Sequence, residues 1–462
     1  MKTNSIKILI ITALVAALAS CSSTRQYQRG SVSTEGLYGK TASTDSVNMA
    51  LQPWNQLFTE SYLQKYIQEG LINNLDLLVA IKKVEEYEAS FKQSKAALLP
   101  GISASGKNSY VRNPESIYPS GPREVNTVQL AAEASWEIDL WGKLRSAKKA
   151  AYANLLASDA SRKLVQTRLV ASIASAYYTL VGLDSRLEIT RQTVKNNIDL
   201  VETMKVLQES GKVNGAAVVQ SEAVRYAAEV TIPDLEQQIR EGENALCLLL
   251  GRAPGSIERG KLNEQTLTSV LQTGIPAQLL DNRPDVMQAE YALMSAYQVT
   301  ANARAYFYPA LTLTATTGFA GKDLENLLDP VSFAANVVGN LAQPVFNKRA
   351  NVTRLKIAKA QQEEALITFR KTLLTAGQEV HNTLGTYQSS LQKATLRKQQ
   401  IDALVKAVEY TRELLTYGTA TYTEVLNAQT SLLSAQLNGV TDQLQQLNAV
   451  VTLYRALGGG WR

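Results

Sequence analysis

Residue types that commonly carry catalysis or hold metals are scarce in this chain of 462 residues. It contains one histidine, His381, and two cysteines, Cys21 and Cys247. Zinc sites draw mainly on cysteine and histidine, and acid–base catalysis most often uses histidine. We also find no nucleophile–base pair, phosphate-binding loop or metal-ligand spacing in the sequence. We therefore expect no enzymatic activity, no metal site and no cofactor.

Cys21 is the residue best placed for a covalent modification. A basic start and an apolar run over residues 8–19 are typical of a secretory signal. The run leads into Leu-Ala-Ser-Cys, which resembles a bacterial lipobox. We predict that residues 1–20 are a signal peptide and that Cys21 is lipidated, palmitate included; an ordinary signal peptide with an incidental cysteine is the alternative. By resemblance to such lipoproteins, Ser22 favours transfer to the outer membrane.

The charge of the chain argues against a nucleic-acid partner. The formal net charge is +6, and removal of residues 1–20 takes away two lysines and leaves +4. That is too small an excess in a chain of this length to indicate nucleic-acid binding. Beyond the signal, no stretch reaches about 18 uninterrupted apolar residues, so we predict no membrane-spanning helix. We expect Cys247, within Ala-Leu-Cys-Leu-Leu-Leu, to be a small buried residue.

The sequence repeats itself at offsets of 205 to 209 residues. The paired motifs are Asn74-Leu75-Asp76 with Arg283-Pro284-Asp285, Pro100 with Pro309, Trp141-Gly-Lys143 with Phe346-Asn-Lys348, Gly211 with Gly418, and Leu250-Gly251 with Leu457-Gly458. We infer one module of about 200 residues, duplicated. The predicted segments are the signal 1–20, an N-terminal belt segment 21–72, a first repeat 73–251, a linker 252–283, a second repeat 284–458 and a tail 459–462.

Proline positions predict where helices can run. No proline lies between Pro122 and Pro233, and none follows Pro344. Because proline breaks helix interiors, these gaps indicate very long helices. For the two repeats we predict opening helices at 73–98 and 284–307, long helices at 143–209 and 348–416, and returning helices at 216–250 and 423–457. We expect Pro233 to kink the first returning helix, whereas Val440 at the matching place leaves the second one smoother.

Each repeat also predicts one β-hairpin, over 102–140 and over 311–345, because apolar and polar residues alternate there. The apolar positions of one parity are Ile102, Ala104 and Tyr110; Val128, Leu130, Ala132, Ala134, Trp136, Ile138 and Leu140; Leu311, Leu313 and Ala315; and Val331, Phe333, Val337, Leu341 and Val345. Lys107 falls on the polar parity. Alternation over about 10–15 residues suits a tilted strand that spans a membrane.

Four strands are too few to close a membrane barrel. An open sheet edge in lipid leaves backbone groups without hydrogen bonds, at several kcal/mol each. The strands must therefore close with copies of the chain. Two copies give eight strands, which side chains fill, so a conducting duct favours three or more copies.

Together these features resemble the TolC-like outer-membrane efflux family, in the lipoprotein branch that serves resistance-nodulation-division (RND) pumps. The motifs that carry the resemblance are Cys21 with its lipobox, Asn73-Asn74-Leu75-Asp76, Leu99-Pro100, Trp136-Glu-Ile-Asp-Leu-Trp-Gly142, Leu249-Leu-Gly251, Arg283-Pro-Asp285-Val, Phe307-Tyr-Pro309, Gln343-Pro-Val-Phe346 and Leu453-Tyr-Arg-Ala-Leu-Gly-Gly-Gly-Trp461. They cover essentially the whole mature chain in a specific order.

The resemblance implies a mainly α fold with some β structure, assembled as a homotrimer. A twelve-strand β-barrel in the outer membrane, four strands per chain, would continue into a long periplasmic α-helical barrel with a mixed equatorial belt. The implied partners are two further copies of the chain, a periplasmic adaptor protein, an inner-membrane RND-type pump and outer-membrane lipid. The implied function is the passive exit duct of a tripartite efflux system for drugs, solvents or metal ions.

The resemblance also implies functional residues at the periplasmic end. Counting from the turn glycine, Glu424 and Asn427 match the ring positions that narrow the pore. Asn427 replaces a second acidic ring of some relatives, and Ala420 replaces an arginine that locks neighbouring helices in others. A plain first-turn helix residue is the alternative for Glu424. The implied adaptor contacts are Gly211, Lys212, Asn214, Gly418, Thr419, Thr421 and Tyr422; plain helix reversal is their alternative, and both can hold.

Two other functions remain open from the sequence. The same architecture could serve as a duct for type I protein secretion, although the lipobox and the Gly-Gly-Gly-Trp ending favour efflux by resemblance. A lipid-anchored structural coiled coil is a third possibility, which predicts neither a barrel nor conductance.

Overall fold

A computed structural model describes residues 27–29, 34, 36–37, 48–116, 123–265, 273–274 and 276–462. The predicted signal peptide and Cys21 lie outside the described residues. The chain forms two compact units. We call them the strand unit, made of Met1–Val32, Lys83–Asp159 and Gln288–Arg370, and the tip unit, made of Ser33–Lys82, Ala160–Met287 and Lys371–Arg462.

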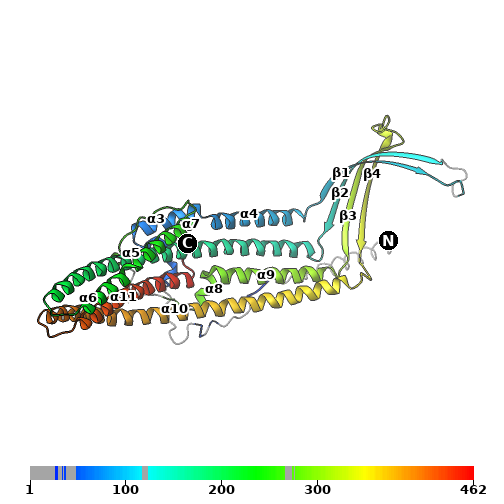
Figure 1. Cartoon of the computed structure of the whole chain (residues 1–462). Helices are drawn as coiled ribbons and strands as arrows, with labels where there is room; N and C mark the ends of the chain where they lie inside the picture. Colours follow the sequence, from blue (N-terminus) through cyan, green and yellow to red (C-terminus); the bar gives the residue numbers. More distant parts are fainter. Residues whose placement is uncertain are drawn as a thin grey trace. The chain divides into compact units, whose positions relative to one another are not determined.

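The two repeats contribute matching elements in the same order (Figure 1). The elements of the first are α4 (Leu75–Ala96), β1 (Gly101–Arg112), β2 (Glu124–Ile138), α5 (Lys143–Glu209), α6 (Gly215–Glu229) and α7 (Thr231–Leu249). The elements of the second are α9 (Pro284–Ala305), β3 (Ala310–Gly321), β4 (Phe333–Ala342), α10 (Ala350–Thr416) and α11 (Tyr422–Ala456). Shorter helices are η2 (Met49–Leu51), α2 (Trp54–Leu57), α3 (Ser61–Asn73), η3 (Leu262–Glu264), η4 (Pro276–Gln278), α8 (Leu279–Asn282) and η5 (Pro330–Ser332).

The long helices predicted from the proline gaps are present. Helices α5 and α10 have 67 residues each, which at 1.5 Å per residue is about 100 Å of helix. Helix α5 has the predicted bounds, whereas α10 begins at Ala350 rather than at residue 348. Lys348 and Arg349 have φ of 53° and 66°, in the left-handed region, so a right-handed helix starts only after them.

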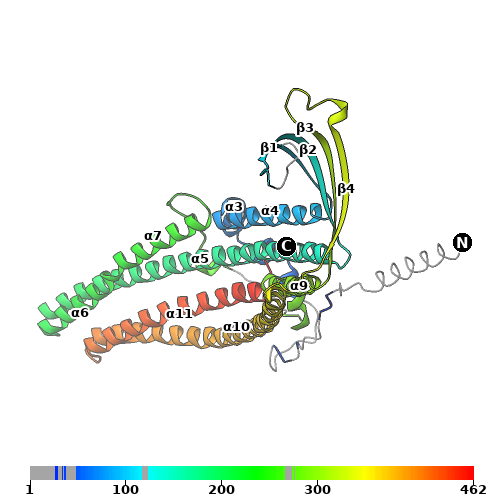
Figure 2. The same cartoon turned by 90° about the vertical axis from the view of Figure 1, so that its right-hand side faces the viewer.

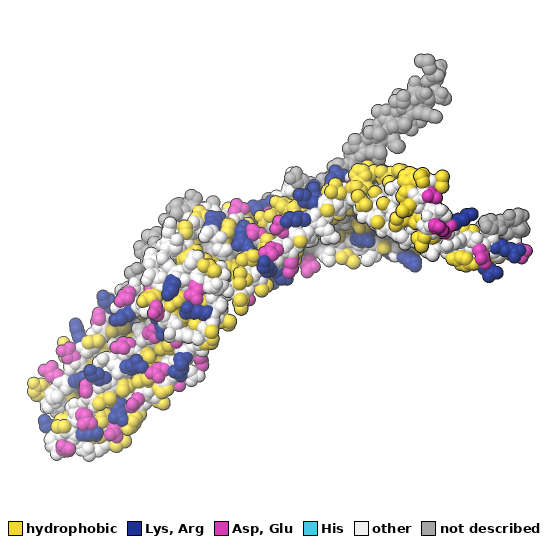
Figure 3. Space-filling view, turned by 90° about the horizontal axis from the view of Figure 1, so that it is seen from above, with side chains coloured by type: hydrophobic (Ala, Val, Ile, Leu, Met, Phe, Trp, Pro, Cys, Tyr) yellow, Lys and Arg dark blue, Asp and Glu magenta, His cyan; other side chains and the backbone are white. Residues whose placement is uncertain are grey.

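The four strands form one antiparallel sheet in the order β1-β2-β3-β4. Its register joins the predicted apolar positions of all four strands on one face, because Ile102 pairs with Ala134, Ala134 with Ala315, and Ala315 with Val337. The other face is polar: Lys107 pairs with Gln129 there. The predicted alternation is therefore confirmed by the register. Figure 3 shows hydrophobic side chains gathered over the strands.

The structure corrects one of the sequence offsets. From α4 to α9 and from β1 to β3 the shift is 209 residues, but from α5 (143–209) to α10 (350–416) it is 207. The match of Trp141-Gly-Lys143 with Phe346-Asn-Lys348 at 205 is therefore wrong by two residues. At 207, Gly142 corresponds to Arg349, and these two residues share a positive φ, 75° and 66°. Similar side chains had suggested an alignment that the backbone does not follow.

In the tip unit, the first returning helix is interrupted and the second is continuous, as predicted, but the interruption lies a few residues before the predicted position (Figure 2). The first is interrupted at Val230, between α6 and α7, and α11 is continuous over 35 residues. The proline ring of Pro233 conflicts with the carbonyl four residues earlier, which belongs to Glu229. The break therefore lies on the N-terminal side of Pro233 rather than at it.

The Leu-Gly pair that ends each repeat packs against the start of that repeat's opening helix. The Asn74 side chain donates to the Leu249 carbonyl at 2.9 Å, and the Arg283 side chain donates to the Ala456 carbonyl at 2.8 Å. A Cβ on Gly251 would collide with the Asn73 carbonyl, and one on Gly458 with the Asn282 carbonyl. The duplicated sequence motifs thus form one duplicated contact.

Arg283 makes the second of these contacts an ionic one. It pairs with Asp285 at 2.6 Å and with Glu379 at 2.9 Å. Burial alone would raise the pKa of Asp285, but the hydrogen bonds and charge of Arg283 outweigh it and hold that pKa below its ordinary value. Asp285 also accepts from its neighbour, the Val286 N–H, at the start of α9.

Across the described ranges, none of the helices combines the length and apolar character needed to cross a bilayer.

Candidate functional site

The predicted contact residues lie at two helix ends with the same backbone geometry. Gly211 and Gly418 have φ of 72° and 73°, as expected for glycine after a helix C-terminus. Gly211 donates to the Gln208 carbonyl at 2.9 Å and Lys212 to the Leu207 carbonyl at 2.9 Å. Gly418 and Thr419 repeat this pair with Leu415 and Leu414, at 3.0 Å each. Both chain reversals are therefore Schellman turns, in which the glycine takes the positive φ.

Each turn is followed at once by a capped helix. The Asn214 side chain accepts from the Ala217 N–H at 3.2 Å and begins α6. In the second turn, Thr421 is the N-cap of α11, and the Glu424 carboxylate in the first turn of that helix accepts from the Thr421 N–H at 2.8 Å. These side chains satisfy backbone donors that the first helical turn leaves open.

The two turns pack on each other through a shared apolar cluster. Its buried members are Leu200, Met204, Ala217, Val218, Leu415, Val425 and Leu426. They come from α5 and α6 of the first repeat and from α10 and α11 of the second. Val213 and Tyr422 of the two turns lie against this cluster, half buried. The cluster therefore holds the two turns together as one surface, which we call the double tip (207–217 and 414–427).

A pocket of about 490 Å³ opens at the double tip. Five of the predicted contact residues line it: Lys212, Asn214, Gly418, Thr421 and Tyr422. Gly211 and Thr419 belong to the same turns but not to the lining. Leu207, Val213, Leu415, Tyr417, Ala420 and Thr423 complete it. The pocket therefore has apolar walls together with hydroxyl, amide and ammonium groups.

The two predicted ring residues are exposed on α11. Glu424 and Asn427 are three residues apart, so they are neighbours on one helix face. The Glu424 carboxylate caps its own helix, which is the first-turn role that the sequence also allowed. The ring role stays a prediction, since it depends on other copies of the chain.

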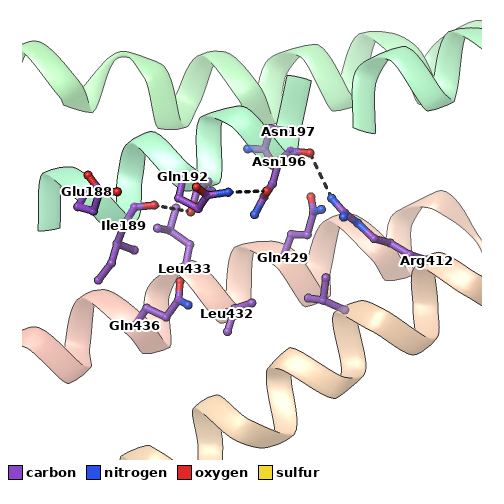
Figure 4. Close-up of a pocket in the computed structure, with 12 residues that line it drawn as sticks. Glu188, Ile189, Gln192, Asn196, Asn197, Arg412, Gln429, Leu432, Leu433 and Gln436 are labelled. Atoms are coloured by element: carbon purple, nitrogen blue, oxygen red, sulfur yellow. Dashed lines mark hydrogen bonds between the residues drawn. The ribbon is translucent and has the colours of Figure 1, made fainter. Parts of the chain in front are cut away.

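A polar network behind the double tip was missed by the sequence reasoning. Figure 4 shows Arg412 of α10 reaching the Asn196 carbonyl of α5, at 3.2 Å. With its amide oxygen toward Arg412, Gln429 of α11 accepts from the arginine at 2.7 Å and donates to Asn197 at 3.1 Å. Asn197 and Gln429 are buried. A cavity of about 310 Å³ adjoins the network.

This network connects three helices that the sequence alone could not bring together. No local pattern in the sequence marks Arg412 and Gln429 as partners. Buried polar side chains that satisfy one another fix a helix register more narrowly than apolar packing does.

Of the two cysteines, only Cys247 lies within the described residues. Cys247 is buried, as predicted, and its thiol lies 3.5 Å from the Gly255 carbonyl. Cys21 lies outside the described residues, so its lipidation stays a prediction. Within the described part of the chain, histidine, cysteine and acidic side chains form no group that could hold a metal ion.

Long paired helices, a small sheet with one apolar face, and internal duplication define a class of protein, the channels of the TolC-like type. A family model described as outer membrane efflux protein matches residues 66–252 and 275–459. The chain therefore belongs to the outer membrane efflux protein family, as its motifs had indicated. The two matched segments correspond to the two repeats, so the duplication is confirmed. Membership supports an outer-membrane location.

Individual relatives agree with this assignment. The chain is 29% identical over 455 residues to the solvent efflux pump outer membrane protein SrpC of Pseudomonas putida, covering 96% of each protein. It is 29% identical over 456 residues to the cation efflux system protein CusC of Escherichia coli, covering 96% of this chain and 97% of CusC. A crystal structure of CusC superimposes with a TM-score of 0.87, at 27% identity, over 95% of this chain and 100% of that one.

Proposed function

We propose that three copies of this chain form the passive exit duct of a tripartite efflux system in the outer membrane. The observation that carries the proposal is the sheet: four strands with one continuous apolar face and two unpaired edges, β1 and β4. In lipid, each unpaired backbone group at an edge costs several kcal/mol. Pairing β4 of one copy with β1 of the next removes every edge.

The number of copies follows from the width of the duct. Two copies give an eight-strand barrel, whose interior is filled by its own side chains. Three copies give twelve strands and an interior wide enough to stay open. The apolar face then contacts lipid, and the polar face with Lys107 and Gln129 lines water, as in outer-membrane barrels generally.

Helices α5 and α10 are each about 100 Å long. We propose that the helices of three copies form the periplasmic part of the duct and that the double tip receives an adaptor protein. The pocket lined by Lys212, Asn214 and Tyr422 supports this, because it combines both turns in one surface. The adaptor would couple the duct to an inner-membrane pump of the RND type, which supplies the energy.

Efflux is favoured over type I protein secretion by the relatives, whose names describe solvent and cation efflux. The proposed cargo is accordingly small organic molecules or metal ions. Cys21 would carry the lipid that adds a second attachment to the membrane. The belt would be formed by the N-terminal segment 21–72 and the linker 252–283.

Glu424 and Asn427 are the proposed gate. Three copies around one axis bring three Glu424 carboxylates together, and such a ring favours cations over anions. Asn427, one turn further along α11, adds a ring of neutral amides. The gate is therefore expected to prefer cations through Glu424 alone.

Conductance in a planar bilayer tests the proposal. Purified protein should form pores that prefer cations, and Glu424→Gln should keep the pores but reduce that preference. Glu413→Gln is a matched control, because Glu413 is an exposed carboxylate of α10 outside the gate. Complete absence of pores from both the native protein and Glu424→Gln would contradict the duct, and an unchanged preference would contradict the gate alone.

A further inference from the structure

The strand unit contains, inside one copy, a contact between the first repeat and the second. Strand β2 pairs with β3: Ile138 lies opposite Leu311, Ala134 opposite Ala315 and Leu130 opposite Phe319. Beyond the strands, the Asn302 side chain of α9 donates to the Lys143 carbonyl at the start of α5, at 2.8 Å. This contact joins the end of one repeat's sheet to the beginning of the next repeat's sheet.

The outer edges of the sheet, on β4 and β1, are equivalent to the edges of β2 and β3 that pair within one copy, but they have no partner strand in one copy. Strand β4 is the equivalent of β2, and β1 is the equivalent of β3. The large apolar side chains along these edges are strongly exposed: Val345 is 99% exposed, Ile102 80%, Val337 69% and Tyr110 61%. Each of them belongs to the apolar face or continues its parity beyond β4.

The offsets that relate the repeats are fixed by the hairpins themselves. Gly101 pairs with Ser135 in the first hairpin and Ala310 with Ala342 in the second. From 101 to 310 the shift is 209, and from 135 to 342 it is 207. The same two shifts relate α4 to α9 and α5 to α10. A residue of β2 therefore moves forward by 207 to β4, and a residue of β3 moves back by 209 to β1.

We propose that β4 of one copy pairs with β1 of the next copy in the register that these shifts dictate. Leu130 opposite Phe319 becomes Val337 opposite Tyr110. Ala134 opposite Ala315 becomes Leu341 opposite Gly106. Ile138 opposite Leu311 becomes Val345 opposite Ile102. This inference rests on the proposed barrel and names which residues of a second copy complete it.

Two features of the sequence agree with this register. Odd residues of β4 meet even residues of β1, so the apolar face continues unbroken into the next copy, and Lys107 meets Asn340 on the polar face. A shift of the register by one residue would place the apolar side chains of one strand on the same sheet face as the polar side chains of the other. The large exposed residues also meet one another, since Val337 faces Tyr110 and Val345 faces Ile102.

The helix contact has an equivalent as well. Asn302 corresponds to Gln93 of α4, at the shift of 209, and Lys143 corresponds to Ala350, at the shift of 207. Gln93 is exposed and is also a primary amide. In the assembly its side chain donates to the Ala350 carbonyl of the neighbouring copy, as Asn302 does to Lys143 within one copy.

Cysteine pairs in the membrane-embedded protein test the register. Residues directly opposite each other in neighbouring strands have Cα atoms about 4.5–5.5 Å apart, and diagonal neighbours about 7–8 Å. Disulfides rarely bridge more than about 7 Å. Tyr110→Cys with Val337→Cys should therefore oxidise to a covalent trimer faster than either Asn108→Cys or Arg112→Cys combined with Val337→Cys. Gly106→Cys with Leu341→Cys gives a second test of the same register.

Tyr110→Cys with Val338→Cys is the matched control, because its two side chains lie on opposite faces, and the single variants give the background. Faster bridging at Asn108 or Arg112, or equal bridging of Val338, would overturn the register. The mass of the uncrosslinked protein separates this failure from that of the duct. A trimer with the wrong bridges overturns only the register, and a species that is not a trimer overturns both proposals.

Discussion

Leu130 offers a sharp test of which sheet face contacts lipid. It lies in the central strand β2, between Gly106 of β1 and Phe319 of β3, on the apolar face. It is six residues from the start of β2 and eight from its end, about 20 Å and 27 Å along the strand. With the tilt usual for barrel strands, this puts Leu130 near the middle of an apolar band about 25 Å tall.

A lysine at this position should be costly. Leu130→Lys puts an ammonium group near the bilayer midplane, where lysine on the lipid face costs about 2–4 kcal/mol. Because every copy carries the substitution, the trimer should lose about 6–12 kcal/mol. Ser105→Lys is the matched control: Ser105 lies beside Gly106 in β1, at the same height but on the polar face. Its cost should stay below about 1 kcal/mol per copy.

The assay is a denaturant titration of the protein folded into lipid vesicles, with the fraction of heat-stable oligomer as a second readout. Leu130→Lys should lower the free energy of unfolding by the amount given above, and Ser105→Lys should remain close to the native protein. If the two variants cost the same, or if Ser105→Lys costs more, the apolar face does not contact lipid and the reasoning from register to barrel is wrong.

Four further predictions concern the tip unit. Gly418→Ala should lower stability in thermal melts by about 1–2 kcal/mol, because it only forces a positive φ, whereas Gly458→Ala should lose more since its Cβ also meets the Asn282 carbonyl. Arg412→Ala should cost about 1–3 kcal/mol in denaturant titrations, because it leaves the amide oxygen of buried Gln429 without its donor, and Arg412→Lys should restore only part of this loss. The Asp285 carboxylate has a lowered pKa, so it stabilises the fold at pH values above its unfolded pKa of about 3.9, and this contribution to the free energy of unfolding is lost as the pH falls below that value. Asp285→Asn should therefore flatten the acid side of a stability–pH profile. Burial raises the pKa of Tyr454 to about 12. The contribution of this shift to the free energy of unfolding is therefore complete below about pH 10 and is lost between about pH 10 and 12. Tyr454→Phe should remove this alkaline loss from the same stability–pH profile.

Features set by short-range rules could be predicted from the sequence. The parity of the strands follows from alternation alone, and the register of the sheet confirms it. The positive φ of Gly211 and Gly418 follows from glycine just after a helix end. Helix α5 could be bounded because Gly142 and Gly211 flank it and no proline lies inside it.

Features that depend on how helices are rotated against each other could not be predicted. The Arg412 network needs α5, α10 and α11 to meet at one level, which no local pattern specifies. The repeat offset near Trp141 was wrong because the match relied on similar residue types, whereas the backbone equivalence joins two dissimilar residues, Gly142 and Arg349. The start of α10 was predicted too early because lysine and arginine rarely adopt a left-handed backbone, so nothing in the sequence indicated the positive φ of Lys348 and Arg349.

The number of copies in the assembly tests the central claim most directly. Native mass spectrometry of the protein extracted from membranes in mild detergent gives this number without reference to transport or partners. We predict three copies, since this is the number that closes twelve strands around an open interior. A stable assembly of two copies, or a monomer that remains folded in the membrane, would contradict the account.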